Sequence, residues 1–155
     1  MNFPILSSLI LLPSIGALFI LLSKSKDQSN YQSSKYVALF VSFANFFISV
    51  YLWYIFDPNI TDFQFVENRS WLPGFINYKV GIDGISILFI VLSTLITPLC
   101  IVSVNKTINT KLKEFLIAIL IMESLMIGVF CSLDLVIFYL FFEGGLIPMF
   151  LIIGI

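Results

Sequence analysis

Five long runs of apolar residues limit what this chain can fold into. They cover residues 3–22, 36–56, 85–104, 115–131 and 135–155. A helix that crosses a bilayer needs about 20 mostly apolar residues, with about 17 as the lower limit. Only 11% of the residues are charged, against about 25% in soluble domains. The sequence therefore predicts an all-α polytopic membrane protein with five transmembrane helices, in a single membrane domain that covers residues 1–155.

The charges between the runs indicate an orientation. Basic residues gather in the first and third connections, which carry Lys24, Lys26, Lys35, Lys106, Lys111 and Lys113. With five spans these two connections lie on the same side of the membrane, and lysine and arginine favour the cytoplasmic or matrix side. The sequence therefore predicts that the N-terminus lies outside.

The second connection, residues 57–83, is long and too polar to form another span. Its aromatic and proline residues are expected to rest at the outer headgroup region: Trp71, Pro73, Phe75 and Tyr78. Asp83 lies between Gly81 and Gly84, directly before the third run. It is a candidate N-cap for that helix, and an ion-loading role for it stays open.

Several kinds of site are excluded by what the sequence lacks. The chain has no histidine, so zinc hydrolysis and Ser-His catalysis cannot reside in it. Cys100 and Cys131 fall within or at the end of apolar runs without metal-ligand spacing, and we interpret them as small buried hydrophobic residues. No glycine-rich phosphate loop and no basic patch with interleaved aromatic residues occurs. We therefore expect no cofactor, metal or nucleic-acid site in this chain.

Two glutamates interrupt the fourth and fifth runs. Charged groups inside a membrane are costly, and by default they are candidates for function. Glu123 precedes Ser132 by about as many residues as Glu143 follows Asp134, so at about 1.5 Å per residue both lie roughly 13 Å from the turn. Two carboxylates at matching depth could face a common polar channel, although the sequence does not show whether they face each other. We predict a role in proton transfer for both, with helix bridging as the structural alternative.

Several other residues in the third and fifth runs are expected to weaken, bend or cap helices. Pro148 cannot donate a hydrogen bond to the carbonyl of Gly144, and Gly144 and Gly145 make the same turn weak, next to Glu143. Pro98 predicts a bend in the third span, which could be no more than a packing kink. Asp134 is expected to cap the fifth helix, and a role at a proton exit stays open.

The segment from Ser132 to Ile155, SLDLVIFYLFFEGGLIPMFLIIGI, closely resembles the chain M family of antiporter-like membrane subunits of NADH-quinone oxidoreductase, called chain 4 in mitochondrial complex I. The segments GIDGISI, which begins at Gly81, and LITPLC, which begins at Leu95, are similar to the same family. The resemblance runs along essentially the whole chain and is strongest from Val80 onward.

The resemblance implies a proton-pumping subunit of respiratory complex I with about fourteen helices in an inverted repeat. In that family the glutamate that matches Glu143 works with a lysine on the seventh span, and Glu123 matches a fourth-span glutamate. NADH, flavin, iron–sulfur clusters and quinone would lie on partner subunits, and the other membrane subunits and lipid would be the partners. The location would be a bacterial inner membrane or the mitochondrial inner membrane.

The chain is short for that family, because it stops where the fifth span ends. We expect an N-terminal fragment, a truncated reading frame or one piece of a split gene, which alone should not pump protons. Two rival functions stay open. One is a sodium/proton antiporter subunit on the same scaffold, and the other is a non-catalytic membrane scaffold in which both glutamates only bridge helices.

Overall fold

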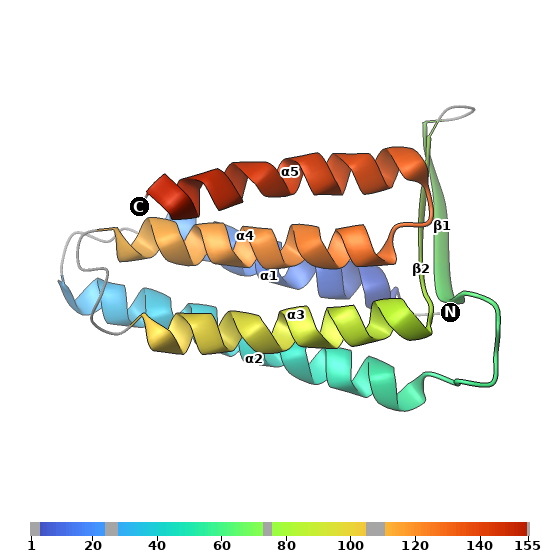
Figure 1. The fold of residues 1–155 in the computed structure, drawn as a ribbon. Coiled ribbons are helices and arrows are strands. Elements are labelled where there is room, and N and C mark those ends of the chain that lie inside the picture. The colour runs from blue at the N-terminus through green and yellow to red at the C-terminus, as the bar shows by residue number, and fades with distance from the viewer. Residues whose placement is uncertain (1–3, 24–27, 73–75, 105–110, 155) are drawn as a thin grey trace.

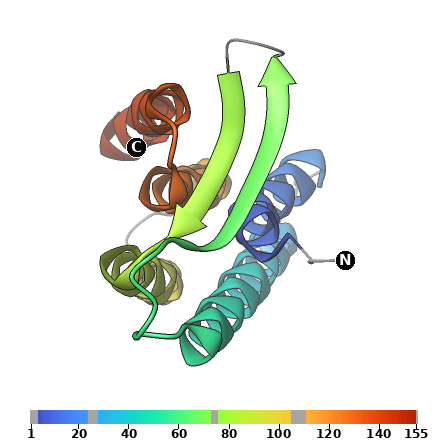
Figure 2. The same ribbon diagram turned by 90° about the vertical axis from the view of Figure 1, so that its right-hand side faces the viewer.

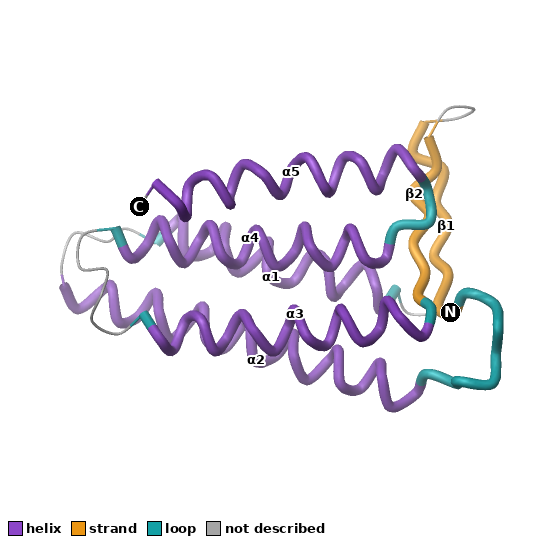
Figure 3. Tube along the Cα trace, viewed as in Figure 1, coloured by secondary structure: helices purple, strands orange, loops and turns teal. Residues whose placement is uncertain are grey.

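The computed structural model describes residues 4–23, 28–72, 76–104 and 111–154. These residues form helices in one bundle and a single β-hairpin (Figures 1 and 3). In chain order the elements are α1 (Ile5–Leu22), α2 (Gln28–Ile55), β1 (Gln64–Leu72), β2 (Ile76–Ile82), α3 (Gly84–Ser103), α4 (Leu112–Cys131) and α5 (Leu135–Gly154).

The predicted fold class of five transmembrane helices is confirmed, because five of the described helices are long and apolar enough to cross a membrane. The largest difference in boundaries is at α2, which begins at Gln28 and not near Tyr36. Its first turns are polar, so a search for apolar residues misses them although the backbone is helical. The outside position of the N-terminus stays a prediction.

Successive helices run in opposite directions (Figure 1). The end of α1, the start of α2, the end of α3 and the start of α4 therefore lie at one end of the bundle, and the hairpin lies at the other. α4 is the central helix, because it packs against α1, α2, α3 and α5. α5 packs mainly on α4, and little of its surface is buried.

The β-hairpin was not predicted. β1 and β2 pair antiparallel and lie across one end of the bundle (Figure 2). The pairing register shifts between Gln64 and Glu67 and again between Ser70 and Leu72. Phe65 lies within the first of these shifts and has a φ of 53°, in the left-handed region that non-glycine residues rarely adopt. These irregularities break the strict alternation of polar and apolar residues by which a strand is recognised in a sequence.

Tyr78 of β2 also contacts the bundle, and its predicted position at the headgroup region stays a prediction. Its side chain is half-buried and packs against the core, and its hydroxyl lies 3.2 Å from that of Ser7. Burial raises the pKa of Tyr78 above its ordinary value. Pro73, Phe75 and the side chain of Trp71 lie outside the described residues.

The hairpin also holds the start of α1. Pro4 precedes that helix and supplies no side-chain cap. The Glu67 carboxylate of β1 takes this role, since it accepts hydrogen bonds from the backbone N–H groups of Leu6, at 2.9 Å, and Ser7, at 3.3 Å. An anion is stabilising at a helix N-terminus. Asp83 caps α3 in the usual way and accepts from the Ser86 N–H at 2.7 Å, so its predicted capping role is confirmed.

The buried core consists of two apolar clusters, one toward each end of the bundle. The hairpin cluster includes Leu6, Ile10, Leu52, Val80, Ile87, Ile90 and Ile127. The opposite cluster includes Ala17, Ile20, Ala38, Ile101, Leu116 and Leu120. On each of the four helices α1 to α4, polar residues separate the part in one cluster from the part in the other.

Candidate functional site: a buried polar layer around Glu123

A layer of polar side chains crosses the middle of the bundle between the two apolar clusters. We call it the polar layer, and its members are Ser14, Ser42, Asn45, Ser49, Thr94, Thr97, Glu123 and Ser124. Seven of the eight are buried, and Ser14 is half-buried. Polar groups in a membrane interior need partners within the protein, because lipid offers none. The layer is therefore a candidate place for polar chemistry inside the membrane.

Glu123 is the acidic residue of this layer, and its hydrogen-bond partner is an amide. The Asn45 Nδ2 of α2 donates a hydrogen bond to Glu123 Oε1 of α4 at 2.8 Å. The Thr97 hydroxyl of α3 is a further polar neighbour of the carboxyl group. Glu123 is only 3% exposed and Asn45 is 0% exposed. Three helices thus meet at one carboxyl group in the bundle interior.

Two atoms of this pair lack a hydrogen-bond partner. Among the described residues, the buried side-chain oxygens without one are Asn45 Oδ1 and Glu123 Oε2. An unsatisfied buried polar atom costs about 1–3 kcal/mol. Both atoms belong to the same contacting pair, so the shortfall is confined to one place in the fold.

The other members of the layer have partners. Ser49 of α2 and Thr94 of α3 lie 2.7 Å apart at their hydroxyl oxygens. The Ser14 hydroxyl donates to Ser124 at 2.8 Å, and Ser124 donates to the Ile10 carbonyl. These bonds tie α2 to α3 and α1 to α4 at the level of Glu123.

Glu143 lies elsewhere. It is exposed on α5, where the Tyr139 hydroxyl, one turn earlier, is its hydrogen-bond partner. The side of α5 that meets α4 carries Gly144, close to Leu125. Leu125 is the second residue after Glu123, which places it roughly 200° around the helix. The structure therefore does not bring the two glutamates together: Glu123 is buried against α2 and α3, and Glu143 is exposed on α5.

The residues expected to weaken α5 have little effect on its helix. α5 is continuous through Pro148, which is buried. A Cβ on Gly144 would lie 3.5 Å from Leu125, and one on Gly145 would meet nothing within 4 Å. Close packing therefore does not require glycine at either position.

Two further expectations concerned helix ends and bends. Asp134 caps α5, since its Oδ1 accepts from the Val136 N–H at 2.9 Å and the Ile137 N–H at 3.3 Å. α3 is continuous through the buried Pro98. The Thr97 hydroxyl, one residue before it, donates to the Ser93 carbonyl at 3.2 Å.

Two residues that shape this site were not predicted from the sequence. Asn45 was not singled out, although an amide in the middle of an apolar run is itself a signal for an interhelical partner. Gly128 of α4 was also missed. A Cβ there would lie 2.7 Å from the Phe141 ring of α5, so glycine is what lets this ring pack on α4.

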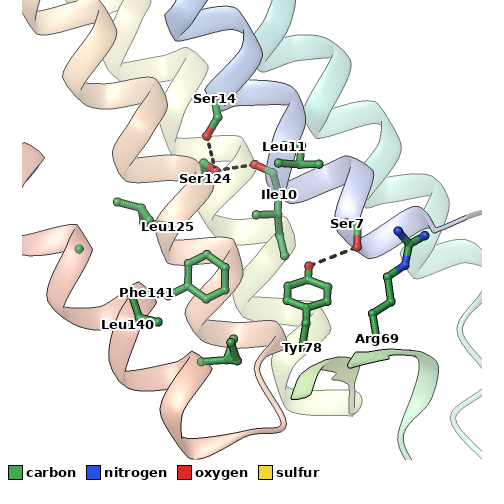
Figure 4. A pocket seen from close by; sticks show the side chains of 12 residues that line it. Ser7, Ile10, Leu11, Ser14, Arg69, Tyr78, Ser124, Leu125, Leu140 and Phe141 are labelled. Atoms are coloured by element: carbon green, nitrogen blue, oxygen red, sulfur yellow. Dashed lines mark hydrogen bonds between the residues drawn. The ribbon is translucent and has the colours of Figure 1, made fainter. Parts of the chain in front are cut away.

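A cavity of about 750 Å³ lies between α1, α4, α5 and the hairpin (Figure 4). Ser7, Arg69 and Tyr78 lie at one end of it, and Ser14 and Ser124 lie farther along. Leu11, Ile10, Leu125, Ile137, Leu140 and Phe141 make most of the remaining lining apolar. Neither Glu123 nor Glu143 belongs to the lining, so this cavity does not connect the two glutamates.

Comparison with known proteins gives the chain its relatives. It is 48% identical over 152 residues to NADH-quinone oxidoreductase subunit M of Rhodobacter capsulatus, a match that covers 97% of this chain. It is 46% identical over 151 residues to NADH-ubiquinone oxidoreductase chain 4 of Marchantia polymorpha, and 42% identical over 156 residues to subunit M of Rickettsia prowazekii. This chain is similar to the N-terminal part of subunit M. No family model matches it.

The similarity to subunit M covers nearly all of this chain and a smaller part of the relatives. The chain spans 29% of the length of the Rhodobacter protein, 30% of the Marchantia protein and 32% of the Rickettsia protein. The relatives are bacterial and mitochondrial, and the described helices supply five candidate membrane spans. The predicted location is therefore confirmed: the chain is a multi-pass protein of a bacterial or mitochondrial inner membrane.

Proposed function

We propose that this chain is a proton-translocating membrane subunit of respiratory complex I, the NADH:quinone oxidoreductase. The observation that carries the proposal is the 48% identity to a subunit M over 97% of the chain. Proton translocation is supported by Glu123 and Glu143, one in each of two adjacent membrane helices. Ionisable groups at such positions are typical of proton relays.

In this proposal the two glutamates carry protons at separate places. Glu123 lies inside the bundle, and Glu143 is exposed on α5. Tyr139 is its partner within α5, and a basic partner for Glu143 would approach from outside the five described helices. The family resemblance makes a lysine on a further span the candidate for this partner.

Other residues on α3 and α5 support the two glutamates in this proposal through their effect on the helix backbone. Pro148, Gly144 and Gly145 leave the turn after Glu143 with fewer constraints on the backbone than an ordinary helix has. Pro98 frees the carbonyl of Thr94, next to Thr97 in the polar layer. Asp134 fixes the start of α5 through its capping bonds.

The redox chemistry belongs to partner subunits in this account. This chain would hold no cofactor, while NADH, flavin, iron–sulfur clusters and quinone would bind elsewhere in the complex. Its partners would be the other membrane subunits of complex I and lipid, and it would bind no nucleic acid.

The proposal can be tested by purifying the enzyme through an affinity tag on this chain in its source cells. We expect NADH:quinone oxidoreductase to co-purify and, in proteoliposomes, to drive proton uptake when NADH and a quinone are supplied. Failure of the enzyme to co-purify would contradict membership of complex I. Ion transport that needs sodium and continues without NADH would favour the antiporter subunit instead.

A further inference from the structure

Glu123 and Asn45 share one hydrogen bond, and each keeps one buried oxygen without a partner. The bond from Asn45 Nδ2 to Glu123 Oε1 is 2.8 Å long. The remaining oxygen of each group, Asn45 Oδ1 and Glu123 Oε2, is buried and has no partner. Both of these atoms are acceptors while the glutamate is ionised, so they cannot bond each other.

A single proton removes this conflict. When Glu123 is protonated on Oε2, that hydroxyl becomes a donor, and Asn45 Oδ1 is the unsatisfied acceptor on the residue it already contacts. We propose that Glu123 and Asn45 together form a proton-binding site. In it the proton sits on Glu123 Oε2 and is donated to Asn45 Oδ1, while Asn45 Nδ2 donates back to Glu123 Oε1.

The surroundings favour this neutral pair over an ionised glutamate. The polar neighbours of Glu123 from the packed helices are Asn45 of α2 and Thr97 of α3, and Ser124 is next to it on α4. In the described part of the chain no charged side chain is recorded in contact with it. Leu120 and Ile127, one turn away on either side, belong to the two apolar clusters. An unpaired buried charge is far more costly than a neutral group with satisfied hydrogen bonds.

The pairing gives Asn45 a defined task as a positioning residue. It fixes the orientation of the carboxyl group and makes release of the proton depend on breaking the reciprocal bonds. A role of this proton site in proton translocation rests on the proposed function. The protonation state itself can be measured without any pumping.

The direct test is infrared spectroscopy of the full chain in lipid nanodiscs at neutral pH. The wild-type spectrum should contain the C=O stretch of a protonated carboxylic acid that is absent from the spectrum of Glu123→Gln. Glu114→Gln is the matched control, because Glu114 is exposed on the same helix. The spectrum of this variant should keep the acid band of Glu123 unchanged. If the Glu123→Gln difference spectrum shows only the bands of an ionised carboxylate, the proposal is wrong, and a water bridge between the two oxygens would explain the pair instead.

A second variant tests the part played by Asn45. In Asn45→Ala the acid band of Glu123 should move to the higher frequency of a weakly bonded carboxylic acid, or disappear. Ser49→Ala is its control, because Ser49 lies one turn later on α2 and bonds Thr94 instead. An acid band at its wild-type frequency in Asn45→Ala would contradict the reciprocal pair.

A stability measurement does not depend on the alanine variant being folded. Glutamine has a donor and an acceptor where protonated glutamate has them, so Glu123→Gln should keep the wild-type unfolding midpoint. Glu123→Leu should lower it, because it leaves both polar atoms of Asn45 unsatisfied. Equal losses in the two variants would contradict the proposal. All of these results are separate from the proposed function, which fails if complex I does not co-purify with the chain.

Discussion

Glu67 of the β-hairpin caps the helix that begins near Leu6: its Oε1 accepts a hydrogen bond from the Leu6 N–H at 2.9 Å. The two residues are far apart in the sequence, and the contact fixes the hairpin to the first membrane helix. The same carboxylate accepts from the Ser7 N–H and hydroxyl. The hairpin thereby supplies the N-terminal cap of a candidate membrane helix.

Replacing this cap should destabilise the bundle. Glu67→Ala removes an anion and several acceptors from the α1 N-terminus, and we expect a loss of about 1 kcal/mol in the free energy of unfolding. Unfolding in a denaturing detergent, followed by circular dichroism, measures the loss. Glu114→Ala, at an exposed position in the first turn of α4, serves for comparison and should cost less. Equal stability of wild type and Glu67→Ala would contradict the capping role.

The contact between α4 and α5 should depend on Gly128. In Gly128→Ala the new Cβ would lie 2.7 Å from the Phe141 ring, and we expect a loss of about 1–3 kcal/mol from overpacking. Gly145→Ala is the matched control, because its Cβ would meet nothing within 4 Å and should cause no loss. The same unfolding assay compares the two variants. A second change, Phe141→Ala, should relieve most of the effect of Gly128→Ala, and full additivity of the two losses would contradict the contact.

The Asp83 cap of α3 should make the stability of the chain depend on pH. Hydrogen bonds from the hydroxyl and N–H of Ser86 hold the pKa of Asp83 below its ordinary value of 3.8. The carboxylate therefore contributes its full stabilisation above pH 3.8, and this is lost as the pH falls through the lower value in the folded state. We expect Asp83→Asn to be less stable than wild type near neutral pH and the difference to shrink in acid. A difference that stays constant with pH would show that the cap does not need its charge.

The orientation in the membrane can be tested with single cysteines. With Cys100 and Cys131 replaced by alanine, Asn59→Cys between α2 and β1 should react with a membrane-impermeant maleimide in right-side-out vesicles. Lys111→Cys, before α4, should react only in inverted vesicles, because the positive connections are predicted to lie inside. The reverse pattern of labelling would place the N-terminus inside.

The five membrane helices could be predicted because each is a long apolar run, which is a local property of the sequence. The hairpin could not, since the left-handed conformation of Phe65 and the shifted register depend on how the strands pair. The depth of Glu123 and Glu143 follows from counting residues. Their separation depends on the faces with which α4 meets its neighbours, and the rotation of a packed helix cannot be read from one sequence.

The pairing of Asn45 with Glu123 shows the same limit. Both residues interrupt apolar runs, so each predicts an interhelical hydrogen bond. Which residue of another helix supplies it depends on helix order and on the relative height of the helices in the bundle. α2 and α4 are not consecutive, and they come into contact only in the assembled bundle.

Proton uptake by the reconstituted enzyme tests the central claim most directly. Complex I that contains this chain with Glu143→Gln should still oxidise NADH, because the redox centres are proposed to lie on other subunits. Since Glu143 is exposed and packs little, the change should leave the fold intact. We predict that proton uptake per NADH oxidised falls severely, and that Glu114→Gln leaves it at the wild-type value. An unchanged ratio of protons to NADH in Glu143→Gln would contradict the account.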